Sequence, residues 1–313
     1  DPAWEDVAQL DAFNSGYRLA ASDTLRDIAS QCDGVRCDMA MLLLDRIFKA
    51  TWGNHTGNPL PQGYWTEVIA STRNHHPDFI FIAEAYWGTE PELLKAGFTY
   101  CYDKELYDLS KNADPVDIER YLHADSSDPG VVRFFENHDE QRAASVFSSD
   151  KSRAAAAALA SLPGARLFHL GQLEGRKLCQ PVFLRRWSEE PVDHELSRFY
   201  RKLLPLASSP IIHQGDWRLC AHHGWQDDHS DENLLCWSWQ YGEEILLAVI
   251  NYSNLPAKGW VTLPWNQPAE KAWQLEDLLK GGSEYHTTME LFNSGLLVEL
   301  PAWDFQLLHC IPA

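Results

Sequence analysis

Three acidic residues follow apolar, strand-like runs in this sequence: Asp38, Glu84 and Asp139. In a parallel sheet the carboxyl ends of the strands meet at one edge, where the connecting loops leave and where ligands bind. We therefore expect the three carboxyl groups to gather around one hollow. A carboxylate that stays ionised beside a carboxyl group that can carry a proton is the pair that cleavage of a glycosidic bond requires.

Basic residues accompany two of these acids. Arg36 and Asp38 are two positions apart, so their side chains share one face of a strand, and a guanidinium there would keep the carboxylate ionised and oriented. His138 directly precedes Asp139. A single acid of this kind is more often a helix cap or a solvated strand end. Three of them at equivalent strand ends, two with basic neighbours, favour a catalytic site.

The surroundings of the second acid suggest a different protonation state. Ile80, Ile82 and Glu84 alternate along one strand and share a face. If that face lines an interior, apolar surroundings would favour the protonated carboxyl group that a general acid needs. Tyr86 and Trp87 follow directly, and because sugar rings stack on aromatic rings, we expect these two side chains to form walls of the site.

The segments between the acids alternate between strand and helix patterns. Strands are predicted at 32–39, 78–87, 98–102, 130–135 and 166–170, and helices at 15–31, 40–50, 64–75, 91–96, 115–123, 151–162 and 193–207. Alternation at this spacing favours a parallel sheet. The first helix would be capped by Asn14 or Ser15, with Leu19, Leu25 and Ile28 on its apolar side.

The pattern changes from about Gln214 onward. Short alternating strands are predicted at 234–239, 244–251, 260–263, 296–300 and 305–310, with turns at 241–242 and 281–282. This pattern is typical of an antiparallel β-sandwich. We therefore expect a strand–helix domain over residues 1–210 and an all-β domain over residues 211–313.

Composition excludes several classes of partner. The 313 residues carry 26 Lys and Arg against 45 Asp and Glu, which gives a net charge of −19. This charge disfavours binding of nucleic acid but does not oppose binding of neutral sugars. No apolar run approaches the roughly 20 residues that span a bilayer. The cysteines are scattered and form no CxxC pair; they stand at positions 32, 37, 101, 179, 220, 236 and 310. This pattern slightly favours a reducing compartment such as the cytoplasm. The chain does not begin with Met, so the compartment stays open, as does the oligomeric state.

Three segments resemble, in the same order, signature segments of the α-amylase family of glycoside hydrolases. They are residues 34–38 (GVRCD), 82–84 (IAE) and 136–139 (ENHD). The resemblance extends more loosely over roughly residues 1–208, and a β-domain follows as in that family. It implies a (β/α)8 barrel of the TIM type that acts on α-glucosidic bonds of α-glucans or maltooligosaccharides with retention of configuration.

The resemblance also implies a role for each site residue. Asp38 matches the nucleophile at the end of the fourth barrel strand, Glu84 the acid/base at the end of the fifth, and Asp139 the third carboxylate, which binds sugar hydroxyls. Arg36 and His138 match the positions that orient substrate and nucleophile. In such a double displacement the nucleophile and acid/base carboxyl groups would lie about 5–5.5 Å apart, and water or a sugar hydroxyl would release the glycosyl-enzyme.

Two features depart from the family pattern. The family's barrel begins with three strand–helix units and an Asn-His signature that are absent here, and five strands cannot close a barrel. We therefore expect a barrel truncated to strands 4–8 and leave the activity of these residues alone open. In addition, Met41-Leu42 stands where many α-amylases carry Lys-His, so a structural calcium is not supported, and no cofactor is expected for the chemistry.

The residues themselves also allow other interpretations of the function. The chain could be a non-catalytic barrel relative that binds sugar or serves as a scaffold, or a metal-dependent hydrolase that uses His138, Asp139 and the other carboxylates. The stretch 222–229 holds His and Asp residues but lacks helical ligand spacing, so we expect no metal there. Glu140 and Arg142 would form an ion pair at the rim of the site or belong to a solvated loop, and we favour the rim role. Hydrolysis and glycosyl transfer are not distinguished.

Overall fold

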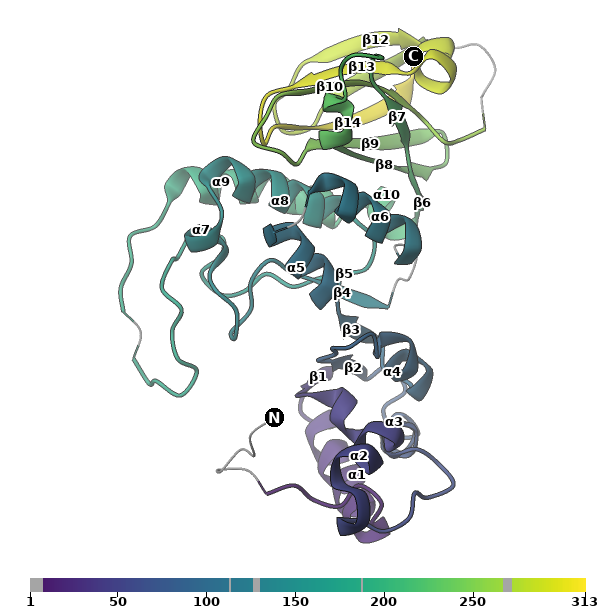
Figure 1. Cartoon of the computed structure of the whole chain (residues 1–313), viewed down its shortest axis with the longest axis vertical. Coiled ribbons are helices and arrows are strands. Elements are labelled where there is room, and N and C mark those ends of the chain that lie inside the picture. The colour runs from purple at the N-terminus through teal and green to yellow at the C-terminus, as the bar shows by residue number, and fades with distance from the viewer. Residues whose placement is uncertain (1–7, 113, 126–129, 187, 267–271) are drawn as a thin grey trace. The chain divides into compact units, whose positions relative to one another are not determined.

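The computed structural model describes residues 8–112, 114–125, 130–186, 188–266 and 272–313 (Figure 1). The chain forms two compact units. The first contains residues 1–104 and 129–132, and the second contains residues 105–128 and 133–313. We describe each unit by itself, and the expected domain boundary at residue 210 stays a prediction.

The first unit is built on parallel strands. β1 (Gly34–Cys37) pairs with β2 (Ile80–Ala83), β2 pairs with β3 (Tyr100–Tyr102), and β3 pairs with the first residues of β4 (Val131–Arg133). The order of the sheet is β1-β2-β3-β4-β5, in which β5 (Ala165–Arg166) belongs to the second unit. In this register Cys37 lies beside Ala83, so β1 and β2 end together and their next residues, Asp38 and Glu84, leave the sheet at the same edge.

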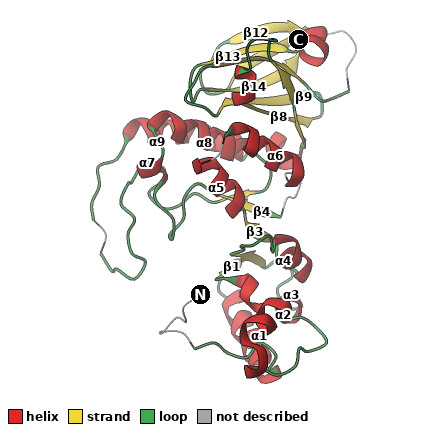
Figure 2. Ribbon diagram, viewed as in Figure 1, coloured by secondary structure: helices red, strands yellow, loops and turns green. Residues whose placement is uncertain are grey.

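The first unit also contains several helices. They are α1 (Ser15–Ala29), η1 (Ala40–Leu43), α2 (Asp45–Trp52), η2 (Gly53–His55), α3 (Tyr64–Arg73) and α4 (Glu90–Ala96) (Figure 2). Phe81 and Ala83 of β2 belong to one apolar cluster with α3 residues such as Val68 and Ile69. Because strand residues alternate, Ile80, Ile82 and Glu84 occupy the opposite face of β2 from this cluster.

Helix α1 is capped as expected, and Leu25 and Ile28 pack against the apolar core as predicted, but Leu19 does not. The Asn14 side chain accepts a hydrogen bond from the Tyr17 amide. Leu19, however, is 63% exposed, whereas Arg18 is fully buried. The Arg18 guanidinium donates to the Ala12 carbonyl at 2.6 Å and to Glu67 at 2.8 Å. The expectation that Leu19 faces the core was wrong, because these acceptors compensate for burial of the charge.

The second unit combines helices with a β-sandwich. Its helices are α5 (Lys104–Asn112), which begins at the last residue of the first unit, α6 (Pro115–Asp125), α7 (Ala143–Val146), α8 (Ser149–Ser161), α9 (His194–Ala207) and α10 (Pro210–Gln214). Pro115 is the first residue of α6, as predicted. The alanine run 154–158 in α8 is buried throughout, so its small side chains allow neighbouring elements to approach closely. Helices α5, α7 and α10 were not predicted.

The antiparallel sandwich predicted for the C-terminal part is present. A three-stranded sheet has the order β13-β10-β7, and a six-stranded sheet has the order β12-β11-β14-β9-β8-β6. The strands are β6 (Asp216–Leu219), β7 (Ala221–His223), β8 (Leu234–Tyr241), β9 (Glu244–Asn251), β10 (Ala257–Thr262), β11 (Ala272–Asp277), β12 (Ser283–Thr287), β13 (Leu296–Leu300) and β14 (Phe305–Pro312), with short helices η3 (Ser230–Asn233) and η4 (Glu290–Ser294). The sequence did not predict β6, β7, β11 and β12.

The central strands of the six-stranded sheet are buried on both faces. Leu247 and Val249 of β9 join the core between the two sheets, whereas Ala248 and Ile250 join the core that contains α8 and α9. The indole of Trp237 in β8 donates to the Ser161 carbonyl at the end of α8, at 3.1 Å. The sequences of these strands are therefore continuous apolar runs rather than alternations of apolar and polar residues.

Within the described ranges, none of the helices combines the length and the apolar character needed to cross a bilayer.

Candidate active site

The turn after β1 brings the chain against the end of β2. Met39 adopts a left-handed backbone with φ of 42°, which non-glycine residues rarely adopt. The Ala40 amide donates to the Glu84 carbonyl at 3.1 Å, and the Glu84 amide donates to the Cys37 carbonyl at 3.0 Å. The Trp65 indole of α3 donates to the Ala40 carbonyl at 2.7 Å. The turn that carries Asp38 is thus fixed to both β2 and α3.

The carboxyl group of Glu84 is buried among hydrogen-bond donors. The residue is 4% exposed. Its Oε2 accepts the Met39 amide at 2.6 Å and lies 3.0 Å from Nη2 of Arg36, and its Oε1 accepts the Tyr86 hydroxyl at 2.8 Å. The expected apolar surroundings are therefore replaced by three polar contacts, which fix the orientation of the carboxyl group.

Arg36 contacts both candidate catalytic acids of the first unit, Asp38 and Glu84. Its guanidinium forms an ion pair with Asp38 and a second one with Glu84, and it lies 5.6 Å from the centre of the Tyr102 ring. Burial opposes the charge, but hydrogen bonds to Asp38 and Tyr102 and the charge of Glu84 outweigh it, so the pKa of Arg36 is raised. The predicted pairing of Arg36 with Asp38 is present, and the additional pairing with Glu84 was not foreseen.

Asp38 and Trp87 are the accessible members of the group. The Asp38 side chain is 75% exposed although one of its oxygens is bound by Arg36. Trp87 is 64% exposed and has a positive φ of 63°. An accessible carboxyl group beside a buried one can serve as a nucleophile next to a proton donor.

The loop after β4, in the second unit, is held by a buried ion pair. Glu136 is fully buried and Arg142 is 3% exposed. Nη1 of Arg142 lies 2.6 Å from Oε1 of Glu136, while Oε2 accepts the Ala143 amide at 2.8 Å. Arg142 also contacts the ring of His169 and donates to the Leu170 carbonyl at 2.8 Å. A buried ion pair therefore connects the first and last residues of the loop 136–142.

Asn137 shapes the tip of this loop. The residue is 3% exposed, and its side-chain oxygen accepts the amides of Asp139 and Glu140, both at 2.9 Å. Nε2 of His138 lies 3.1 Å from Oδ2 of Asp139, and both side chains are partly exposed. This is an Asx-type turn that presents the Asp139 carboxylate next to an imidazole.

The predicted ion pair between Glu140 and Arg142 was wrong. Arg142 pairs with Glu136, and Glu140 forms a hydrogen bond with the Tyr107 side chain. Burial of the phenol and this hydrogen bond raise the pKa of Tyr107. The preference of Arg142 has a simple cause: a buried carboxylate requires a charged partner far more than a partly exposed one does.

The structure thus assembles the site residues in two groups. Arg36, Asp38, Glu84 and Tyr86 are in contact within the first unit, and His138 and Asp139 are in contact within the second. The gathering of all three acids around one hollow stays a prediction. Glu136 and Asn137 were not singled out from the sequence, although both directly precede His138 and Asp139.

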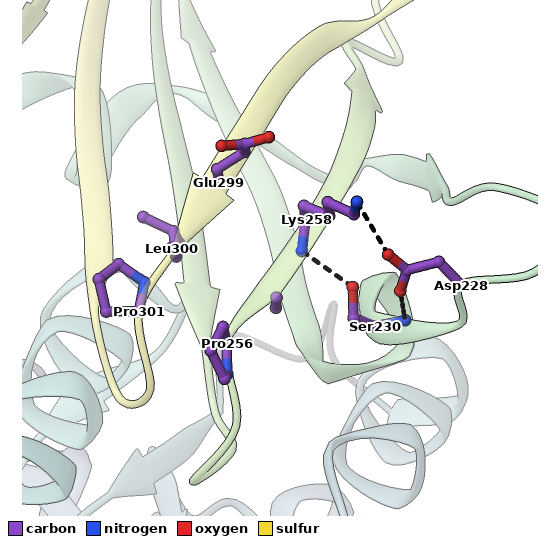
Figure 3. A pocket seen from close by; sticks show the side chains of 8 residues that line it. Asp228, Ser230, Pro256, Lys258, Glu299, Leu300 and Pro301 are labelled. Atoms are coloured by element: carbon purple, nitrogen blue, oxygen red, sulfur yellow. Dashed lines mark hydrogen bonds and ion pairs between the residues drawn. The ribbon is translucent and has the colours of Figure 1, made fainter.

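A hollow of about 750 Å³ also lies in the β-sandwich, outside these groups (Figure 3). Lys258 in β10 pairs with Asp228 at 3.1 Å, and its amide donates to the Ser230 hydroxyl at 3.2 Å. Hydrogen bonds from Ser230 and Lys258 lower the pKa of Asp228 to about 2. Two of its charged groups, Lys258 and Asp228, are thus already paired with one another.

The histidine-rich stretch 222–229 is engaged in ion pairs. Nε2 of His222 lies 3.2 Å from Glu119 of α6, and Nδ1 lies 3.6 Å from Asp231. Among the described residues, no group of three His, Cys, Asp or Glu side chains is arranged to hold a metal ion. Met41, at the position considered for the calcium site, is fully buried in the apolar core of the first unit, and its side chain offers no oxygen ligand.

Comparison with known proteins relates the chain to α-amylases. No family model matches the chain. A curated relative, the α-amylase MalA of Haloarcula japonica, is 27% identical over 183 residues, which are 56% of this chain and 25% of the relative. The chain thus spans a quarter of the length of that relative.

Solved structures support the same relationship at the level of fold. The noncanonic maltogenic α-amylase AmyB of Thermotoga neapolitana superimposes with a TM-score of 0.75 at 18% identity, covering 98% of this chain and 69% of that one. The α-amylase of Geobacillus thermoleovorans, solved with acarbose, gives 0.70 at 17% identity, covering 96% and 65%. An α-amylase of Lactobacillus plantarum gives 0.70 at 20% identity, covering 98% and 69%. The chain has the α/β fold of the α-amylases with a C-terminal antiparallel sheet domain, and the resemblance seen in the three sequence segments is confirmed.

Proposed function

We propose that this chain carries the catalytic acids of a retaining glycoside hydrolase or transglycosidase that cleaves α-glucosidic bonds of α-glucans or maltooligosaccharides. The observation that carries the proposal is the contact of one guanidinium, Arg36, with both Asp38 and Glu84 at adjacent ends of parallel strands. Such a bridge keeps an accessible carboxylate and a buried carboxyl group in one fixed arrangement, as a double displacement requires.

Asp38 is the nucleophile in this proposal. Its side chain is exposed enough to reach a sugar, and Arg36 stabilises its ionised form. It attacks the anomeric carbon while Glu84 gives its proton to the leaving glycosidic oxygen. Water or a sugar hydroxyl then attacks the glycosyl-enzyme, Glu84 takes the proton from it, and Asp38 leaves as a carboxylate.

Asp139 and His138 have a binding role in this proposal. The Asn137 turn presents the Asp139 carboxylate, which accepts hydrogen bonds from sugar hydroxyls, and His138 contributes a ring nitrogen beside it. Trp87 is exposed and offers a ring face for stacking against a sugar. The five strands β1–β5 correspond, in this proposal, to the fourth to eighth strands of a (β/α)8 barrel.

The proposal is tested with three variants of the full-length protein: Asp38→Asn, Glu84→Gln and Asp139→Asn. Each should lower kcat on maltooligosaccharides by about 10²–10⁴-fold or more, since each removes a group that acts on the reacting atoms or on the bound sugar. Asp27→Asn, an exposed acid of α1, is the matched control and should leave kcat unchanged.

The configuration of the first product tests the retaining course. Proton NMR during the first turnovers should show the α-anomer of the released sugar. Wild-type turnover by all three variants would show that the proposal is wrong. Sugar binding by the wild-type protein without turnover would instead support a non-catalytic, sugar-binding relative.

A further inference from the structure

The two oxygens of the Glu84 carboxyl group have different partners. Oε2 accepts the Met39 amide at 2.6 Å and faces Nη2 of Arg36 at 3.0 Å, whereas Oε1 accepts only the Tyr86 hydroxyl, at 2.8 Å. A carboxylate has about four positions for hydrogen bonds, two on each oxygen. Among the described residues the Met39 amide and the Tyr86 hydroxyl fill one position on each oxygen, and the Arg36 guanidinium stands beside Oε2 alone, in an ion pair.

The partners also differ in what they can do. A backbone amide and a guanidinium only donate, so a proton placed on Oε2 would face two donors and displace them. Both donors are fixed, because Met39 belongs to the turn held by β2, and Arg36 is held by Asp38. A proton on Oε1 requires no such change, since the Tyr86 hydroxyl occupies only one of its two positions.

We propose that Oε1 of Glu84 carries the catalytic proton and that Tyr86 is the positioning residue that holds this oxygen, rather than a wall of the sugar site. The inference rests on the proposed function. It assigns the two oxygens different tasks: Oε2 anchors the side chain to the β1 turn, and Oε1 exchanges the proton with the substrate.

The proton balance of both steps follows from this assignment. In the first step the Oε1–H bond breaks and an O–H bond forms at the glycosidic oxygen, which keeps the electron pair of the broken C–O bond, while an Asp38 oxygen bonds to the anomeric carbon. In the second step Oε1 takes a proton from the attacking water as the bond between Asp38 and the sugar breaks. The Tyr86 hydroxyl donates to Oε1 throughout and is not consumed.

The hydroxyl also biases the protonation of Glu84. A hydrogen bond donated to a carboxylate stabilises its ionised form. The charged and polar groups that face this carboxyl group are Arg36 and the Met39 amide from the side of β1, and Tyr86 from the loop after β2. Arg36 in turn contacts Asp38 and, from β3, Tyr102. Without the phenol hydroxyl this stabilisation is lost.

The test is the pH dependence of kcat/KM for Tyr86→Phe in the full-length protein. The acid must be protonated in the free enzyme, so the alkaline limb of the profile should move to higher pH by about one unit, the value of a hydrogen bond to a charged group. We expect kcat at the optimum to fall about tenfold, with KM changed less than twofold. A wall of the sugar site would instead raise KM and leave the alkaline limb in place.

Two further variants make the outcome specific. Tyr17→Phe removes a phenol hydroxyl that lies 3.3 Å from the Tyr64 hydroxyl and has no role in the proposed site, so it should leave the profile unchanged. Glu84→Gln, measured in parallel, tests the proposed function itself. If Glu84→Gln abolishes turnover and the alkaline limb of Tyr86→Phe coincides with that of the wild type, the role of Tyr86 is disproved while the proposed function stands. If Glu84→Gln retains turnover, the proposed function fails.

Discussion

Glu136 and Arg142 form an ion pair in which Nη1 and Oε1 are 2.6 Å apart and neither residue is more than 3% exposed. The pair lies within the loop that also carries His138 and Asp139. Its carboxylate is satisfied on both oxygens, by Arg142 and by the Ala143 amide. The loop conformation around the third acid therefore depends on charges that are inaccessible to the substrate.

Loss of one partner of this pair should destabilise the fold. Glu136→Gln leaves the Arg142 guanidinium buried without its counter-charge, and we expect the free energy of unfolding to fall by about 3–5 kcal/mol. Urea unfolding followed by circular dichroism measures the change.

The matched control for this prediction is an exposed pair in the same unit. Glu195→Gln breaks the 3.7 Å contact with Arg153, in which the Glu195 side chain is 74% exposed. Its effect should stay below about 1 kcal/mol. Equal effects of the two substitutions would contradict the role assigned to burial.

The Asn137 side chain should control turnover rather than overall stability. Asn137→Ala removes the acceptor for the amides of Asp139 and Glu140, so the Asp139 carboxylate loses its fixed position. Under the proposed function we expect kcat to fall by roughly 10–100-fold, since a displacement of about 1 Å at a reacting group has an effect of that size.

The conservative variant separates this effect from a general loss of structure. Asn137→Asp keeps an oxygen acceptor at the same place and should recover most of the lost turnover. Steady-state kinetics on a maltooligosaccharide give kcat and KM for both variants. Recovery that is no better than in Asn137→Ala would show that the two amide contacts do not position Asp139.

The His222 contacts predict a pH-dependent contribution to stability. Burial opposes the imidazolium, but the hydrogen bond and charge of Glu119 and the charge of Asp231 outweigh it, so the pKa of His222 is raised above 6.5. The hydrogen bond from His222 in turn lowers the pKa of Glu119 below 4.5, with His123 adding to the effect. The imidazolium contribution is complete below the unfolded-state value of His222 and is lost as the pH rises through the folded-state value. The carboxylate contribution is complete above the unfolded-state value of Glu119 and is lost as the pH falls through its folded-state value.

The two contributions are therefore both present between pH 4.5 and pH 6.5. Urea unfolding of the wild type and of His222→Gln should differ most in this window, and the difference should shrink above it. A difference that is constant from pH 5 to pH 9, or that grows with pH, would contradict the protonated state of His222.

The sequence by itself determined the elements that place Asp38 and Glu84. Local apolar runs predicted a strand before each acid, and β1 and β2 do end at Cys37 and Ala83, directly before them. Strand alternation placed Arg36 beside Asp38 for the same reason, because a two-residue repeat is a property of the strand alone. The closely spaced strand patterns likewise predicted the C-terminal sandwich, since turns and alternation are local signals.

Only the tertiary structure decided which charged side chains are buried and with which partners. Arg18 is buried in place of Leu19 because acceptors from residues 12 and 67 converge on its guanidinium. Arg142 pairs with Glu136 rather than Glu140, and Glu84 meets the Met39 amide and the Tyr86 hydroxyl rather than an apolar column. The free energy of a buried charge depends on atoms that folding brings together from distant parts of the chain, and no spacing along the sequence encodes that sum.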